Sequence, residues 1–131
     1  MYFSVASLQE ITSFSLTSST SVNSAIATYT FLVTFPIPLV DGDKLYILAP
    51  SEITNPTSSS PTCQGASSNI ENNLSCQSSS IVLRITLDFP DSQGNQLASG
   101  TSFSFNVSGY QNPSSTDASS NFRVYAIDSN N

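Results

Sequence analysis

The clearest alternation of apolar and polar side chains in this chain lies between residues 25 and 50. Apolar side chains recur at every second position from Tyr29 to Phe35, and threonines occupy most of the positions between them. Leu32 is the only large apolar residue on the threonine side. A period of two in β-branched and aromatic residues predicts a strand with one buried face.

The residues that follow this strand predict its end and a second strand. Proline cannot donate to a strand ladder, so we expect Pro36 and Pro38 to terminate the pairing. Asp41-Gly42-Asp43 is typical of a turn. Residues 44–48 alternate again and Pro50 follows them, so the whole segment is expected to form a long hairpin.

The same analysis predicts further strands in the rest of the chain, and no stretch has a convincing helical period. These strands are expected at residues 2–6, 11–17, 81–89, 101–110 and 122–126. About seven strands with turn signals between them predict an all-β, antiparallel, immunoglobulin-like β-sandwich. At 131 residues the chain is expected to form a single module. Residues 1–10 are expected to belong to it, to link modules, or to form a strand exchanged with a neighbour.

Serine and threonine dominate the surface composition. Together they make up 40 of the 131 residues, whereas only 9% of the residues are charged. Soluble domains usually carry about 25% charged residues. Because charge is the ordinary source of solubility, we expect glycans or a fixed place in an assembly to keep this protein in solution.

The charge balance excludes some classes of partner. The net charge is -6, and the only basic residues are Lys44, Arg84 and Arg123. A chain with so few cations is not expected to bind nucleic acid or an anionic membrane. No apolar run approaches the 18 or so residues that cross a bilayer, so no membrane insertion is expected. The N-terminus lacks the pattern of a signal peptide and the C-terminus resembles a linker, which suggests an excerpt from a longer chain.

Cys63 and Cys76 are the only cysteines, and they close a loop of about 14 residues in a serine-rich segment. A disulfide is expected here, because such a loop offers no apolar burial and the composition is extracellular in character. The alternative is a pair of buried thiols in a cytosolic protein. A zinc site needs four ligands, and the chain has no histidine and no other cysteine.

Several residues match acceptors for glycans. Two N-x-Ser/Thr sequons lack an intervening proline, at Asn73 and Asn106. Asn106 is the better candidate, because it alternates with inward-facing Phe105 and Val107 and should point to solvent. Ser/Thr clusters beside proline predict weaker O-glycosylation candidates, with bare polar loops as the alternative. They are Thr57, Ser58, Ser59, Ser60, Thr62, Ser114, Ser115 and Thr116.

Neither a metal site nor an enzymatic site is predicted. Asp41 and Asp43 would hold calcium only if Asp88 or Asp91 joined them, because calcium takes six to eight oxygen ligands. A turn is the better interpretation of Asp41-Gly42-Asp43. The absence of histidine removes the usual general base and every Ser-His arrangement. We therefore expect no catalysis and no cofactor.

Several motifs occur in one order that is similar to a known family. They are Tyr29-Thr30-Phe31, Pro36-Ile37-Pro38, Ser60 to Cys63, Leu74 to Cys76, Thr101 to Gly109, Asn112 to Thr116 and a final strand from Phe122 to Tyr125. Over residues 10–128 this order resembles the Ser/Thr-rich β-sandwich repeats of very large cell-surface and secreted proteins of ciliated protozoa. The resemblance implies an extracellular, repetitive, glycosylated protein without enzymatic activity. The Asp-Gly-Asp turn departs from the uncharged turn that is frequent in that family.

Two functions are compatible with these features. The first is a structural module of an extracellular, glycosylated repeat protein that forms a surface coat, appendage or filament. Its partners would be copies of itself or neighbouring repeats in head-to-tail order, with residues 2–17 adding a strand to a neighbour's edge. The alternative is an adhesin-like or carbohydrate-binding sandwich that acts through loops, with Tyr2, Tyr110 and Tyr125 as its exposed rings.

Overall fold

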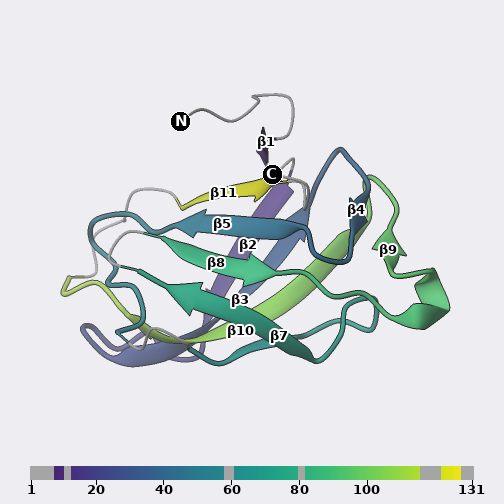
Figure 1. The fold of residues 1–131 in the computed structure, drawn as a ribbon. Coiled ribbons are helices and arrows are strands. Elements are labelled where there is room, and N and C mark those ends of the chain that lie inside the picture. The colour runs from purple at the N-terminus through teal and green to yellow at the C-terminus, as the bar shows by residue number, and fades with distance from the viewer. Residues whose placement is uncertain (1–7, 11–12, 58–60, 80–81, 116–121, 128–131) are drawn as a thin grey trace.

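The computed structural model describes residues 8–10, 13–57, 61–79, 82–115 and 122–127. These residues form an antiparallel β-sandwich, so the predicted all-β fold is confirmed, but with eleven strands and not seven (Figure 1). The strands are β1 Leu8–Glu10, β2 Ser13–Ser18, β3 Ile26–Thr34, β4 Leu39–Val40, β5 Lys44–Leu48, β6 Cys63–Gly65, β7 Asn73–Ser78, β8 Leu83–Thr86, β9 Gln96–Leu97, β10 Ser102–Gln111 and β11 Arg123–Ile127. A short 3-10 helix spans Asp91–Gln93. The predicted strand at residues 2–6 lies outside the described residues.

One continuous sheet folds over itself to make both layers. Its strand order is β1-β11-β5-β8-β7-β6-β10-β3-β2, and a small separate pair joins β4 to β9. Strand β7 pairs with β6 through its first residues and with β8 through its last, so the sheet bends there. The front layer is β1-β11-β5-β8-β7, and β10, β3 and β2 cross behind it (Figure 1). No helix in the described residues is long and apolar enough to cross a membrane.

The prediction that residues 25–50 form a hairpin is wrong, although both of the predicted strands exist. Strand β3 pairs with β2 and β10 at the back, whereas β5 pairs with β11 and β8 at the front. Each strand has one apolar face, and placing the strands in opposite layers lets these faces meet. Residues 35–43 contain two prolines and cross between the layers without a long ladder, which separates the two strands.

The core between the layers is built from the predicted inward faces. Phe31 and Phe105 stack with ring centroids 5.1 Å apart, and Tyr29 stacks on Tyr110 at 4.9 Å. Phe122 packs edge-on against Phe31 with a centroid distance of 5.7 Å. Offset and edge-on ring pairs add stability beyond the apolar area that they bury. The aromatic alternation of β3 and β10 therefore decides which faces form the core.

The segment before β3 supplies the two edge strands of the folded sheet. Strand β1 pairs with β11 at the front, and β2 pairs with β3 at the back. Unpaired sheet edges are sites of aggregation, and this chain has few charges with which to block them. In the single chain the described part of residues 2–17 therefore lies on its own module.

Tyr110 is buried, although alternation along β10 places it on the polar side. The register of β10 against β3 shifts between Ser108 and Tyr110, and Gly109 has a φ of 95°. Such a bulge inserts one residue and turns the next side chain to the other face. Tyr110 is fully buried, and within the described part of the chain its hydroxyl has no hydrogen-bond partner. The prediction that Tyr110 offers an exposed ring is wrong.

We expect Tyr110→Phe to raise the free energy of unfolding by about 1 kcal/mol, because it removes an unsatisfied buried hydroxyl. Burial also raises the pKa of Tyr110. The native state therefore keeps this proton above about pH 10, where an unfolded tyrosine ionises, so stability falls as the pH rises past that value. Urea titrations at pH 7 and pH 11 measure this fall in the free energy of unfolding, and the fall should be smaller in Tyr110→Phe than in the unmodified protein.

Tyr29→Phe is the matched control, since the Tyr29 hydroxyl donates to the Asn112 side-chain oxygen at 2.7 Å. It should lower stability at pH 7 by about 1 kcal/mol. A destabilised Tyr110→Phe protein would contradict the expected gain.

Asn112, which follows β10, is hydrogen-bonded to the loop before β3. Its Oδ1 accepts from Tyr29, and its Nδ2 donates to the carbonyls of Thr20 and Val22 at 2.9 Å each. Its backbone N–H donates to the carbonyl of Ala25. The side chain is buried, so these partners replace the water that it loses.

Asn112→Ala is expected to lower the free energy of unfolding by about 2 kcal/mol, because it leaves the buried Tyr29 hydroxyl without its acceptor and removes two hydrogen bonds to loop carbonyls. Urea denaturation followed by circular dichroism measures this loss. Asn106→Ala is the control, since it removes one half-exposed hydrogen bond, from Thr30, and should cost under about 1 kcal/mol. Equal losses in the two variants would contradict the role of Asn112.

Candidate functional site

The outward positions of the front layer align four polar or aromatic side chains across four strands. Residues Tyr125 and Tyr46 are paired across β11 and β5, Tyr46 and Arg84 across β5 and β8, and Arg84 and Gln77 across β8 and β7. We call these four residues the tyrosine–arginine row. Their neighbours along each strand point into the core, so strand alternation alone fixes the row on the outer face.

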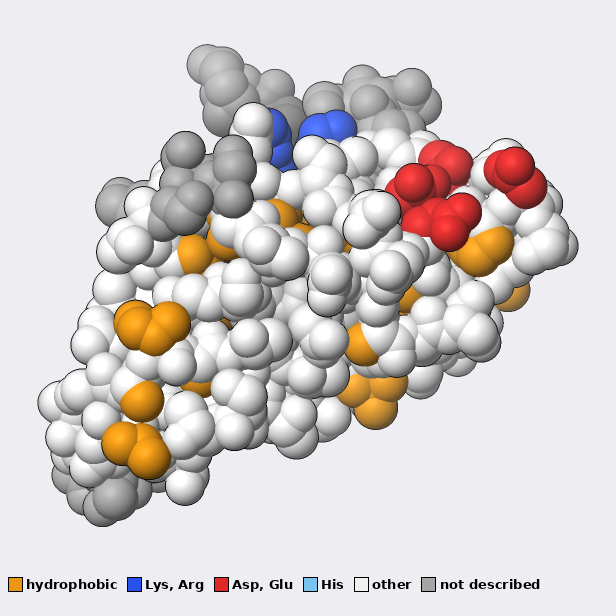
Figure 2. Space-filling model, turned by 90° about the horizontal axis from the view of Figure 1, so that it is seen from below, with side chains coloured by type: hydrophobic (Ala, Val, Ile, Leu, Met, Phe, Trp, Pro, Cys, Tyr) orange, Lys and Arg blue, Asp and Glu red, His pale blue; other side chains and the backbone are white. Residues whose placement is uncertain are grey.

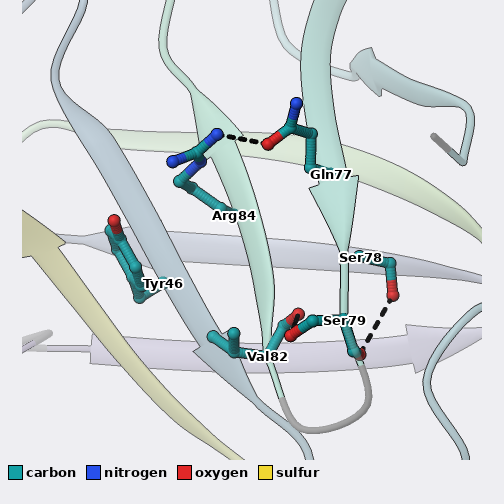
Figure 3. Close-up of a pocket in the computed structure, with 6 residues that line it drawn as sticks. All are labelled: Tyr46, Gln77, Ser78, Ser79, Val82 and Arg84. Carbon is teal, nitrogen blue, oxygen red and sulfur yellow. Dashed lines mark hydrogen bonds between the residues drawn. The ribbon is translucent and has the colours of Figure 1, made fainter. Parts of the chain in front are cut away.

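A hollow of about 240 Å³ lies over part of this row. It is lined by Tyr46, Gln77, Ser78, Ser79, Val82 and Arg84 (Figure 3). A side-chain N–H of Arg84 donates to the amide oxygen of Gln77. The hydroxyls of Ser78 and Ser79 donate to the carbonyls of Pro56 and Val82 at 3.0 and 3.2 Å. The lining is therefore held in place by contacts within the protein.

All three basic residues lie on the outer face of the front layer. Arg123 stands over the ring of Tyr125, with its guanidinium carbon 5.1 Å from the ring centroid. Lys44 donates to the carbonyl of Gly42 at 3.3 Å. Acidic side chains gather at one end of the molecule and the basic ones lie apart from them (Figure 2). These three residues are the only cations of a protein whose net charge is -6.

The acidic turn brings together carboxylates that the sequence suggested as calcium ligands. Asp41 accepts from the backbone N–H of Phe89 at 2.7 Å, and Asp43 accepts from that of Val40 at 2.9 Å. Partial desolvation and the nearby Asp41 carboxylate raise the pKa of Asp88. Within the described residues, no group of three or more acidic, histidine or cysteine side chains could hold a metal ion. These contacts support a structural turn.

Cys63 and Cys76 form a disulfide at the bend of the sheet. Cys63 lies in β6 and Cys76 in β7, and both are buried. Their Cα atoms are 6.3 Å apart, within the usual range for the bond. Disulfides persist in oxidising compartments, so the bond is compatible with a secreted or extracellular protein.

The two N-glycosylation candidates have different surroundings. Asn73 is exposed at the first position of β7. Asn106 lies in the middle of β10, is half-buried, and its Oδ1 accepts from the hydroxyl of Thr30 at 2.7 Å. Accessibility thus favours Asn73, which reverses the order expected from the sequence. The reason is that β10 is a central strand with neighbours on both sides.

The described O-glycosylation candidates lie at the surface. The residues in exposed positions are Thr57, Thr62, Ser114 and Ser115. The remaining candidates, Ser58, Ser59, Ser60 and Thr116, lie outside the described residues. Exposure makes the first four accessible to modification.

A second hollow, of about 470 Å³, lies at the end of the sandwich near β9. Its amide side chains hold the loop together, since Gln93 donates to the carbonyls of Asn69 and Gln96 at 3.1 Å each. Asn69 in turn donates to the carbonyl of Ser102 at 2.8 Å. These contacts give the residues a structural role, so the tyrosine–arginine row is the better candidate for a binding site.

Comparison with known proteins adds no assignment, because no protein-family model and no curated protein matches the chain. Sequence reasoning missed Tyr46, Arg84 and Gln77 as a group. The sequence pattern could identify each of them as an outward position of its own segment. It could not show which strands are neighbours in the sheet, and so it could not bring the three residues together.

Proposed function

We propose that the chain is a structural module of an extracellular, glycosylated repeat protein that forms a surface coat, appendage or filament. The motif order that resembles the ciliate surface repeats supports this proposal. The strongest structural support is the disulfide between Cys63 and Cys76, which links β6 and β7 at the bend of a sheet whose two edge strands are β1 and β2. Such a module resists unfolding without help from charge.

The ends of the described fold suggest how such modules would be connected. The chain enters β1 at Leu8 and leaves β11 at Ile127, and these two residues are paired. Paired antiparallel residues have Cα atoms roughly 5 Å apart. Modules in series would follow one another head to tail along the chain. Each module would project to one side of the line formed by the linkers, and neighbouring modules would contact each other through their sides. That arrangement is suited to a coat.

Electron microscopy of the native material, with mass spectrometry of the same sample, tests the proposal. We expect regular arrays of modules that project from a common line, with a mass per module well above that of the polypeptide. The excess should disappear after enzymatic deglycosylation. A monodisperse particle at the polypeptide mass would contradict the proposal.

A second candidate function is saccharide binding. The sequence placed it on loops, but the buried Tyr110 does not offer an exposed ring and Tyr2 lies outside the described residues. The tyrosine–arginine row favours it instead on the outer face of the front layer, where two half-exposed rings lie beside amide and guanidinium groups. Aromatic rings with a few positioned polar groups are typical of small-ligand sites.

A further inference from the structure

The hollow beside Arg84 has the dimensions of a site for one small ring. Its volume of about 240 Å³ is below the 300–1,000 Å³ that is usual for drug-sized ligands. Strands β5, β8 and β7 supply most of its lining residues, and side chains on a sheet are positioned more rigidly than those on loops. The site therefore suits a single saccharide residue better than an extended chain.

Arg84 gives the hollow its charge selectivity. Its guanidinium carries five N–H donors, and in the described part of the chain its one side-chain partner is the neutral amide of Gln77. That contact orients the guanidinium along the row and leaves other donors for a ligand. Arginine binds carboxylates through charge-assisted hydrogen bonds, which are roughly twice as strong as neutral ones.

The remaining lining residues match a sugar ring with hydroxyl groups. Tyr46 and Val82 supply apolar surface next to Arg84, and the paired positions of Tyr46 and Arg84 put ring and charge side by side (Figure 3). The O–H of Ser79 donates to the carbonyl of Val82, and its oxygen keeps its lone pairs for a ligand's O–H groups. Ser78 is paired with the buried Leu83, so its side chain lies on the inner face and its hydroxyl donates to the carbonyl of Pro56. A sugar presents both apolar C–H surface and hydroxyl donors.

We propose that the hollow formed by Tyr46, Gln77, Ser78, Ser79, Val82 and Arg84 binds a hexuronate residue of an acidic glycan. The carboxylate lies against Arg84, the ring against Tyr46, and the hydroxyl groups against Gln77 and Ser79. This inference rests on saccharide binding as the second candidate function, and it names the ligand class and the residues. It is compatible with the structural role, since an acidic glycan on a neighbouring molecule would join modules in a coat.

Titrations of the isotopically labelled protein test the inference by following the backbone amide resonances of Gln77 to Ser79 and Arg84. The probes are glucuronate, glucose and acetate at about 0.15 M ionic strength, where long-range charge effects are screened. We expect glucuronate to saturate with a dissociation constant of about 1 mM, in the range for a ligand of this size. Glucose and acetate should each bind at least about tenfold more weakly, because each lacks one of the two contacts.

Two arginine variants provide the matched comparison. Arg84→Gln should weaken glucuronate binding about tenfold or more. Arg123→Gln removes the same charge from the same face but outside the lining of the hollow, and should change binding by less than about twofold. Circular dichroism of both variants checks that they fold.

Tyr46→Leu tests the contact with the sugar ring. It should weaken glucuronate binding while leaving the weak acetate binding unchanged.

Each other outcome overturns a defined part of the inference. Equal weakening in the two arginine variants would reduce the effect to general charge attraction and overturn the site. Equal binding of acetate and glucuronate would show an anion site and overturn saccharide binding as a function. Equal binding of glucose and glucuronate, unchanged in Arg84→Gln, would overturn the acidic class and leave saccharide binding standing. Failure of all probes to saturate would overturn both.

Discussion

Replacing Phe31 by alanine is expected to lower the free energy of unfolding by about 4 kcal/mol, within the range for truncation of a buried phenylalanine. Phe31 is fully buried, stacks on Phe105 and receives the edge of Phe122. These contacts join both layers, so the cavity left by the ring cannot close by a shift of one strand. Guanidinium denaturation followed by circular dichroism measures the loss.

Leu32→Ala is the control, because Leu32 is the next residue of the same strand and 45% exposed. Its loss should stay below about 1 kcal/mol, since nearly half of the residue is already exposed to water and less apolar burial is removed. The pair of variants isolates burial from strand propensity. A loss in Leu32→Ala as large as that in Phe31→Ala would mean that β3 faces the other way and would contradict the assignment of the core.

Local alternation predicted the faces of the long strands correctly. Tyr29 to Phe35 and Phe103 to Val107 turn their apolar residues inward, as expected. Alternation failed at Tyr110, where a bulge at Gly109 inserts one residue and reverses the faces. A one-residue irregularity of this kind depends on the partner strand, because the register with β3 shifts there, and the partner is invisible in the local pattern.

The connection between strands was harder to predict than the strands themselves. A turn between two alternating segments is the usual signal of a hairpin, yet β3 and β5 lie in different layers. The decisive feature was the pair of prolines at positions 36 and 38, which removes ladder donors just where a hairpin would need them. Burying the apolar faces of both strands against each other across the core then stabilises the fold more than pairing their edges would.

The tyrosine–arginine row could not be predicted for the same reason. Each of its members is an ordinary outward residue of its own strand, and the paired residues Tyr46 and Tyr125 are 79 positions apart in the sequence (125 − 46). Only the strand order β11-β5-β8-β7 aligns them. The disulfide, in contrast, could be predicted from the sequence, because two cysteines in one chain allow a single intramolecular pairing.

Reduction of the bond between Cys63 and Cys76 is expected to lower the free energy of unfolding by about 3 kcal/mol. The two cysteines are separated by 13 positions, and closing a loop of that size removes this much chain entropy from the unfolded state. For a domain of this size the loss corresponds to a fall of about 10 °C in Tm. Thermal unfolding with and without a phosphine reductant measures it.

The double variant Cys63→Ala/Cys76→Ala separates the crosslink from the packing of the sulfur atoms. Both cysteines are buried, so the variant should lose about 1 kcal/mol more than reduction alone and should not respond to the reductant. The crosslink also keeps its loop closed when the chain is pulled. Reduction should therefore lengthen the fully extended chain by about 40 Å, since each freed residue adds roughly 3.4 Å. An unchanged Tm and extension after complete reduction would mean that the bond does not restrain the unfolded chain.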